Sequence, residues 1–292
     1  MTTIYDPHHP LYLDEADTRK ELERVYDLCH GCRLCFKFCP SFPTLFDYID
    51  QHDDQDAGKM TPAQQDHVAD ECFQCKLCYI NCPYIPSLHE WALDFPRLML
   101  RTDAMRRANG HMSTRNKVTT AVMGRTDALG KAATSVSVVT NVVMGAKPGS
   151  LIRKVVEKTA GISSVRMLPP FAKTRFSTWF KRRPKIRLNN PKAKVAVFPT
   201  CLVEYQDPSI GQDLVKVYEH NGIECTIADN AACCGAPYLH SGDMATFTKV
   251  AAKNVANLAA EVRKGNDIVV PQPTCSYVLK KDYLDYVGGP DA

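Results

Sequence analysis

The sequence predicts a chain of three parts: a cysteine-rich helical region at residues 1–96, a basic helical linker at 97–187 and an α/β region with a parallel sheet at 188–292. Three observations predict this fold class. A twelve-residue cysteine run occurs twice in the first part, positive charge collects in the middle, and strands alternate with helices in the last part. The length of 292 residues is enough for about two domains, so one part is expected to be a connection.

The first part contains an internal repeat. The run CHGCRLCFKFCP at residues 29–40 returns as CFQCKLCYINCP at residues 72–83, with every cysteine shifted by 43 positions. Thirteen cysteines, many of them at such short spacing, do not indicate a disulfide framework in a chain of this length, and the N-terminal residues show no secretory signal. The cysteines therefore indicate metal ligands in a reducing compartment.

The spacing C-x2-C-x2-C-x3-C-P favours iron–sulfur clusters over other metal sites. It is similar to the run of two-cluster bacterial ferredoxins, in which the fourth cysteine of each run binds the other cluster. A zinc ribbon needs only four ligands, and haem attachment needs a histidine directly after C-x-x-C. The resemblance implies two [4Fe–4S] clusters. The ligands would be Cys29, Cys32, Cys35 and Cys82 for the first cluster, and Cys72, Cys75, Cys78 and Cys39 for the second.

Helical patterns precede both runs. Leu22, Val25 and Tyr26 recur at helical spacing before the first run, and Thr61–Pro62 is a helix start before the second. With 32 residues between the runs, this part resembles the α-helical ferredoxin domain of the iron–sulfur protein of succinate dehydrogenase. Arg33 and its repeat counterpart Lys76 either place positive charge beside an anionic cluster or lie on a solvated face.

In the last part, strands are expected at 193–200, 223–229 and 267–275, with helices between them. This order favours a parallel sheet, whose functional loops lie beyond the carboxyl ends of the strands. Four cysteines follow strands and should meet there: Cys201, Cys233, Cys234 and Cys275. They could hold a third iron–sulfur cluster or a zinc ion, or be ordinary buried cysteines. Cys225 lies inside a strand and is expected in the core.

The cysteine motifs together resemble a known family. Cys233-Cys234-Gly235, preceded by Cys201 and followed by Cys275, is similar to the CCG domain of heterodisulfide reductases. With the paired runs, it resembles the C subunit of anaerobic glycerol-3-phosphate dehydrogenase and heterodisulfide-reductase-related proteins. Two departures stand out: Val278 replaces a further cysteine, and one CCG domain is present where two are usual. The chain is therefore expected to be a fragment or a short form.

The resemblance implies an electron-transfer subunit that connects a flavoprotein dehydrogenase to a membrane quinone or another acceptor. It also implies a cytoplasmic location, peripheral on the inner face of the cell membrane. The residues leave open whether the chain is itself an enzyme. One alternative is a disulfide or heterodisulfide reductase that uses a CCG-bound cluster, and another is a redox sensor. No G-x-G-x-x-G follows a strand, so no nucleotide site is indicated.

The middle part is strongly basic, with 20 Lys and Arg against 3 acidic residues in 97–187. Small apolar residues mixed with cations, and Trp179 beside a cationic cluster, favour contact with an anionic membrane surface. Docking on an acidic partner or on the acidic first part is the alternative. Nucleic acid is not an expected partner of a chain with two redox clusters. The sequence has no apolar stretch of about 18 residues, the length that a spanning helix needs.

Overall fold

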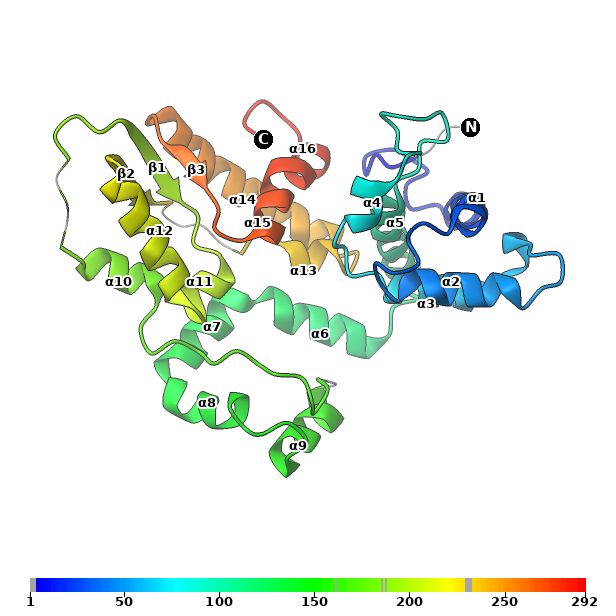
Figure 1. Ribbon diagram of the computed structural model, residues 1–292, viewed down its shortest axis with the longest axis horizontal. Helices are drawn as coiled ribbons and strands as arrows, with labels where there is room; N and C mark the ends of the chain where they lie inside the picture. Colours follow the sequence, from blue (N-terminus) through cyan, green and yellow to red (C-terminus); the bar gives the residue numbers. More distant parts are fainter. Residues whose placement is uncertain (1–3, 161, 185, 187, 229–232) are drawn as a thin grey trace. The chain divides into compact units, whose positions relative to one another are not determined.

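The computed structural model describes residues 4–160, 162–184, 186, 188–228 and 233–292, which Figure 1 traces. The chain divides into two compact units. The first contains Met1–Asn116 and the segment Tyr238–Met244, and the second contains Lys117–Pro237 and Ala245–Ala292. The predicted boundaries at residues 96 and 187 follow composition and charge, whereas these two units are defined by contacts in the structure. The three-part division of the sequence therefore stays a prediction.

The first unit is built of helices. They are α1 (Glu15–Cys32), α2 (Ser41–Asp50), the 3-10 helix η1 (Ala57–Lys59), α3 (Pro62–Asp70), α4 (Leu77–Asn81) and α5 (Phe95–Ala108). In Figure 1, α2 lies along α3, and α1 packs on α5. Their shared core is apolar, with Leu22, Val25 and Tyr26 of α1 fully buried as their helical spacing predicts.

Local sequence explains where these helices begin. The Asp14 carboxylate accepts a hydrogen bond from the Asp17 N–H at 2.8 Å and caps α1. Thr61 and Gln64 form a capping box at α3, with Pro62 in the first turn. Each cap satisfies backbone N–H groups that have no partner inside the helix.

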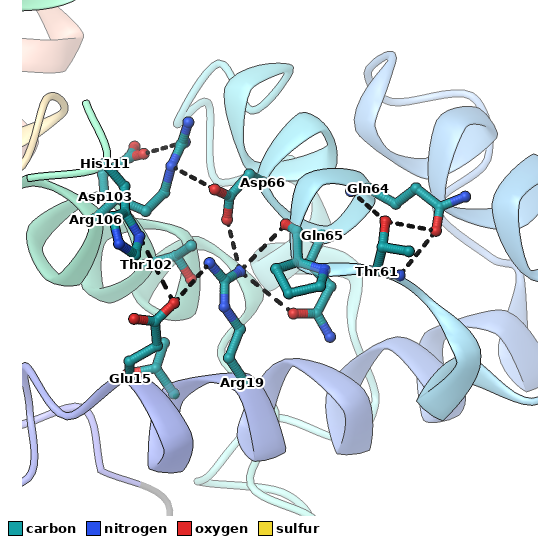
Figure 2. Close-up of polar contacts among 12 residues, drawn as sticks. Glu15, Arg19, Thr61, Gln64, Gln65, Asp66, Thr102, Asp103, Arg106 and His111 are labelled. Carbon is teal, nitrogen blue, oxygen red and sulfur yellow. Dashed lines mark hydrogen bonds and ion pairs between the residues drawn. The ribbon is translucent and has the colours of Figure 1, made fainter. Parts of the chain in front are cut away.

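An arginine network joins three helices of this unit (Figure 2). Arg19 of α1 and Arg106 of α5 both pair with the Asp66 carboxylate of α3, at 2.6 and 3.1 Å. Arg106 also pairs with Asp70 and Asp103, at 2.7 and 3.1 Å. Burial raises the pKa of Asp103 to about 7, although Arg106 opposes the shift. The network therefore links α1, α3 and α5 through charges that, apart from that of Asp70, are largely removed from water.

The segment 238–244 belongs to the first unit although it lies far along the chain. Gly242 has a φ of +72°, and a Cβ there would lie 2.2 Å from the carbonyl oxygen of Asp103. Asp243 pairs with Arg107 at 2.8 Å. Only glycine allows this close approach of the segment to α5.

The second unit combines helices with a small sheet. Helix α6 (Thr114–Gly124) begins in the first unit, and α13 (Ala236–Leu239) ends there. The other elements are α7 (Thr126–Ser135), α8 (Ser137–Met144), α9 (Leu151–Ala160), α10 (Phe176–Arg182), β1 (Ala193–Val197), α11 (Cys201–Tyr205), α12 (Pro208–His220), β2 (Ile223–Ile227), α14 (Met244–Arg263), β3 (Asp267–Val269), α15 (Pro273–Tyr277), the π-helix η2 (Val278–Asp282) and α16 (Tyr283–Tyr286).

The sheet is parallel, in the order β2-β1-β3, which confirms the parallel sheet that the sequence predicts. Val195 lies opposite Cys225 on one side and Asp267 on the other. Cys225 is buried in the core of this unit, as its place in a strand predicts. Trp179 of α10 packs on Phe176 at 5.8 Å between ring centroids, so it contributes to this core.

Candidate metal centres

The first cysteine run lies at the end of a helix. Cys29 and Cys32 belong to the last turn of α1, and Arg33 ends the helix in the left-handed conformation, with a φ of 54°. The Arg33 N–H donates to the carbonyl oxygen of Cys29 at 2.8 Å. The chain then leaves the helix, so that Cys35 lies near Cys29 and Cys32.

One small cavity gathers three cysteines of the first run and one of the second. It is lined by Cys29, Cys32, Cys35 and Cys82. Its other walls are mostly apolar and come from Leu28, Leu34, Phe42, Pro83, Tyr84 and Leu93. Burial and the neighbouring cysteines raise the pKa of the Cys29 thiol, and they raise that of Cys35 to about 12. Four thiolates need a bound cation to be stable in such a cavity. The donor set fits a soft metal ion or an iron–sulfur cluster.

The second run lies between two helices. Cys72 and Cys75 follow the end of α3, and Cys78 is in the short helix α4. Burial raises the pKa of Cys72 to about 12, and the nearby Cys39 of the first run contributes. Burial also raises the pKa of Cys78, with contributions from Cys35, Cys72 and Cys39. The structure therefore brings Cys39 near Cys72 and Cys78, whereas Cys75 is exposed.

The four cysteines of the last part also come together. Hydrogen bonds link Cys201 to Cys233, Cys233 to Cys234, and Cys234 to Cys275. All except Cys201 are buried. The hydrogen bond from Cys201, joined by one from Cys234, lowers the pKa of Cys233 in spite of its burial. Sulfur donors of this kind suit zinc or an iron–sulfur cluster. Among the described residues, no three His, Cys, Asp or Glu side chains converge closely enough to bind a single metal ion, so these cysteine sets are assigned from their donor chemistry and shared surroundings.

Residues outside the cysteine motif support this site, and the sequence patterns do not predict them. The Thr126 hydroxyl lies 3.1 Å from the Cys201 sulfur. The neighbouring Asp127 accepts hydrogen bonds from the Cys233 N–H and from the Tyr205 hydroxyl, each at 3.1 Å. Both residues begin α7, inside the segment that the composition predicts to be a linker. One sequence feature could have indicated Asp127: it is one of only three acidic residues in 97–187.

The backbone of the cysteine pair is held by two further side chains. The Asn254 amide donates to the Cys233 carbonyl oxygen at 3.0 Å, and the Tyr283 hydroxyl donates to that of Cys234 at 2.9 Å. Val278, which replaces a further cysteine of the family pattern, is buried with 1% exposed. This site therefore has four sulfur atoms and a carboxylate nearby.

Comparison with known proteins defines the class of this chain. A 4Fe-4S dicluster domain matches residues 21–83, and a cysteine-rich CCG domain matches residues 195–280. The chain is therefore an iron–sulfur protein that combines these two domains. It is homologous to the C subunit of anaerobic glycerol-3-phosphate dehydrogenase, which confirms the resemblance seen in the sequence.

With that relative from Escherichia coli (strain K12), the chain is 28% identical over 183 residues, which are 62% of this chain and 45% of the relative. The match thus spans less than half of the relative. The B subunit of fumarate reductase (CoM/CoB) from Methanothermobacter marburgensis is 31% identical over 98 residues, 33% of this chain and 19% of that protein. Lactate utilization protein A of Bacillus pumilus is 31% identical over 93 residues, 32% of this chain and 36% of that protein. No solved structure matches the chain.

Proposed function

We propose that the chain is an electron-transfer subunit. Its two [4Fe–4S] clusters would carry electrons from a flavoprotein dehydrogenase of the glycerol-3-phosphate dehydrogenase type to a membrane quinone or another acceptor. One observation carries this proposal: Cys82 of the second run lines the same cavity as Cys29, Cys32 and Cys35 of the first. An exchange of the fourth ligand makes the two clusters neighbours, which is the arrangement that electron transfer needs.

The residues of the first unit have distinct roles in this proposal. The first cluster would be held by Cys29, Cys32, Cys35 and Cys82, and the second by Cys72, Cys75, Cys78 and Cys39. A bound cluster supplies one-electron redox chemistry. Leu28, Phe42 and Leu93 exclude water from the first set. Because Cys75 is exposed, the second set would lie near the surface, where a partner can approach.

The CCG site would hold a third iron–sulfur cluster or a zinc ion through Cys201, Cys233, Cys234 and Cys275. Thr126 and Asp127 position two of these cysteines through the contacts described above. This proposal assigns the chain no catalytic residue of its own, because the substrate would react on the partner dehydrogenase.

The exposed apolar side chains of α8 and α9 support peripheral membrane contact, on the inner face of the cell membrane. Val138 and Val142 of α8 are 76% and 63% exposed, and Leu151 of α9 is 81% exposed. Lys154 and Lys158 of α9 are exposed beside them. Within the described residues, no helix is both long enough and apolar enough to cross a bilayer. Apolar side chains flanked by lysines are the composition that binds an anionic membrane surface.

The test of the cluster proposal is the metal content of the anaerobically purified chain. About eight iron atoms per chain, with labile sulfide and two interacting [4Fe–4S] signals in electron paramagnetic resonance (EPR) after dithionite reduction, are expected. About twelve would add a third cluster at the CCG site. A chain that binds only zinc and contains no labile sulfide would overturn the proposal.

The membrane proposal needs a separate test. The chain should sediment with vesicles that contain anionic lipid and should stay free of neutral vesicles at moderate salt. The double variant V138D/V142D should lose this binding and keep its iron content. Equal sedimentation of the variant would contradict the assignment to α8.

A further inference from the structure

The two cysteine runs carry a basic residue at the same repeat position, Arg33 in the first and Lys76 in the second. The two side chains differ in burial and in their partners. Arg33 pairs with the Asp50 carboxylate at 2.5 Å, and its guanidinium lies over the Phe46 ring at 5.1 Å. The Arg33 side chain is 44% exposed. Its charge is therefore matched by a carboxylate and screened by water.

Lys76 is buried, with only 8% exposed. Its ammonium donates a hydrogen bond to the side-chain oxygen of Gln74 at 2.7 Å. The amide nitrogen of Gln74 donates in turn to the Cys72 sulfur at 3.6 Å and to the Pro96 carbonyl oxygen at 3.1 Å. Because these bonds polarise one another in a buried setting, the positive charge of Lys76 acts on the Cys72 sulfur through Gln74.

The backbone contributes at the same place. Gln74 and Lys76 both have left-handed conformations, with φ of 53° and 64°. In this conformation the Gln74 side chain contacts the Cys72 sulfur through its amide nitrogen and the Lys76 ammonium through its amide oxygen. At the equivalent position, the first run has Gly31, which has no side chain to donate to a sulfur.

Three other charged groups near the two sets, Arg24, Asp94 and Asp103, are each engaged in an ion pair. Near the first set, Arg24 lies close to Cys29, but two hydrogen bonds commit its guanidinium to Glu21, at 2.7 and 2.8 Å. Asp94 also lies near the first set, close to Cys82, and pairs with Arg97 at 3.5 Å. Near the second set, Asp103 opposes Lys76, but it is itself paired with Arg106.

His240, from the segment 238–244 of the same unit, lies close to Lys76. Burial, and then Lys76, lower the pKa of His240 to about 4. The imidazole is therefore neutral at pH 7 and adds no charge to the surroundings of the second set.

We infer that Gln74 and Lys76 give the cluster held by Cys72, Cys75, Cys78 and Cys39 the higher reduction potential of the two. A reduced cluster carries one more negative charge than its oxidised form, so nearby positive charge and N–H donors stabilise the reduced form. The Cys82 sulfur of the first set accepts a hydrogen bond from the Tyr84 N–H at 3.4 Å, but the walls of that cavity are mostly apolar and the nearby Arg24 is paired with Glu21. The first cluster therefore gains less of this stabilisation. The inference rests on the proposed function, because it assumes that both clusters are present.

The inference fixes which cluster holds an electron that has entered the pair. One electron from the reduced flavoprotein partner enters the pair, and at equilibrium it resides on the second cluster. The first cluster is reduced and then reoxidised as the electron moves on, so one electron enters and one leaves. The exposed Cys75 then marks the side from which the acceptor is reduced.

The test is a redox titration of the anaerobically purified full chain, monitored by EPR. The variant C75S should lose the signal of the second cluster, so the midpoint that disappears belongs to that cluster. In the unaltered chain, that midpoint should be the higher of the two. K76M should lower it and leave the other unchanged, whereas the matched control R33M should move either midpoint less. Q74L should also lower the midpoint of the second cluster. K76R keeps the positive charge, so its midpoint should stay close to that of the unaltered chain.

Two results would overturn the inference: a lower midpoint for the second cluster in the unaltered chain, or equal shifts in K76M and R33M. If K76M does not retain the second cluster, Q74L decides, because an unchanged midpoint in Q74L also overturns it. A chain without any [4Fe–4S] signal would instead contradict the proposed function, so the two failures are distinguishable.

Discussion

The two cysteine runs have the same spacing but different supports. The first run starts inside α1, and its set lies in a mostly apolar cavity. The second run begins after α3 and contains α4, uses left-handed backbone at two residues and leaves Cys75 exposed. The difference teaches that the repeated cysteines define which group can be bound, whereas the residues between and around them define its properties.

The largest expected effect comes from the fourth cysteine of each run. If these ligands are exchanged, C82S removes the cluster of the first run and C39S removes that of the second. Each variant should therefore fall from about eight iron atoms per chain to about four. Iron analysis and EPR measure this change. The spectrum of C82S should match that of C29S, and the spectrum of C39S should match that of C72S.

Cys225 offers the control for these serine variants, because it is buried in the sheet of the second unit. C225A should keep all of its iron. Spectra of C82S that match those of C72S would show that each run keeps its own fourth ligand.

The apolar wall of the first set gives the next effect. Phe42 is 1% exposed, packs on Phe95 at 4.7 Å between ring centroids and lines the first cavity. F42A should lower the free energy of unfolding by about 3–5 kcal/mol, measured by chemical denaturation under anaerobic conditions. The repeat counterpart Ile85 is only partly buried, so I85A should cost less. Equal losses would show that the two runs are enclosed equally.

Asp103, on the side of the second run, predicts a pH dependence. Its carboxyl has a pKa of about 7 in the folded protein and about 3.8 when unfolded. Between these values the folded state binds more protons, so its stability falls as the pH rises, and the loss is complete above pH 7. D103N should therefore raise the melting temperature at pH 8 more than at pH 5. The stabilisation at pH 8 should be of the order of 1–4 kcal/mol.

The melting temperature should be compared with that of D70N at both pH values. Asp70 pairs with the same arginine but is 47% exposed, so D70N should show no such gain at pH 8. A D103N variant that is less stable than the unaltered chain at pH 8 would contradict the prediction.

Asp50, on the side of the first run, predicts the opposite sign and the smallest effect. Hydrogen bonds from Arg33 and His30 lower the pKa of its carboxyl. A carboxyl whose pKa is lowered by folding stabilises the protein at pH values above its unfolded-state pKa. This stabilisation is lost as the pH falls through the folded-state pKa. D50N should thus lower the melting temperature slightly at pH 7, because the pair is exposed to water. A gain in stability would contradict the prediction, because it would show that the Asp50 carboxylate destabilises the folded protein.

Much of the chain could be predicted because its patterns are local. The apolar stripe of α1, the Thr61–Pro62 start of α3 and the alternation that gives a parallel sheet all depend on residues close in sequence. The dicluster and CCG assignments also followed from short motifs. The choice of iron over zinc at each site stays a prediction.

The remainder depended on contacts between distant residues. Asp127 reaches the Cys233 N–H across 106 positions, and nothing in its own neighbourhood indicates a partner. The burial of Lys76 could not be read from the repeat either, because Arg33 at the same position is exposed. Charge alone also did not indicate that Trp179 would pack into the core of the second unit.

The close approach of Gly242 to α5 has a consequence for biosynthesis. Residue 238 follows Cys82, the last cysteine of the two runs, by 156 positions. At typical translation rates these positions take roughly 8–30 s to synthesise. All eight ferredoxin-type cysteines therefore leave the ribosome well before the segment that completes their unit. Any group that these cysteines bind can therefore reach them before Gly242 and Asp243 dock on α5.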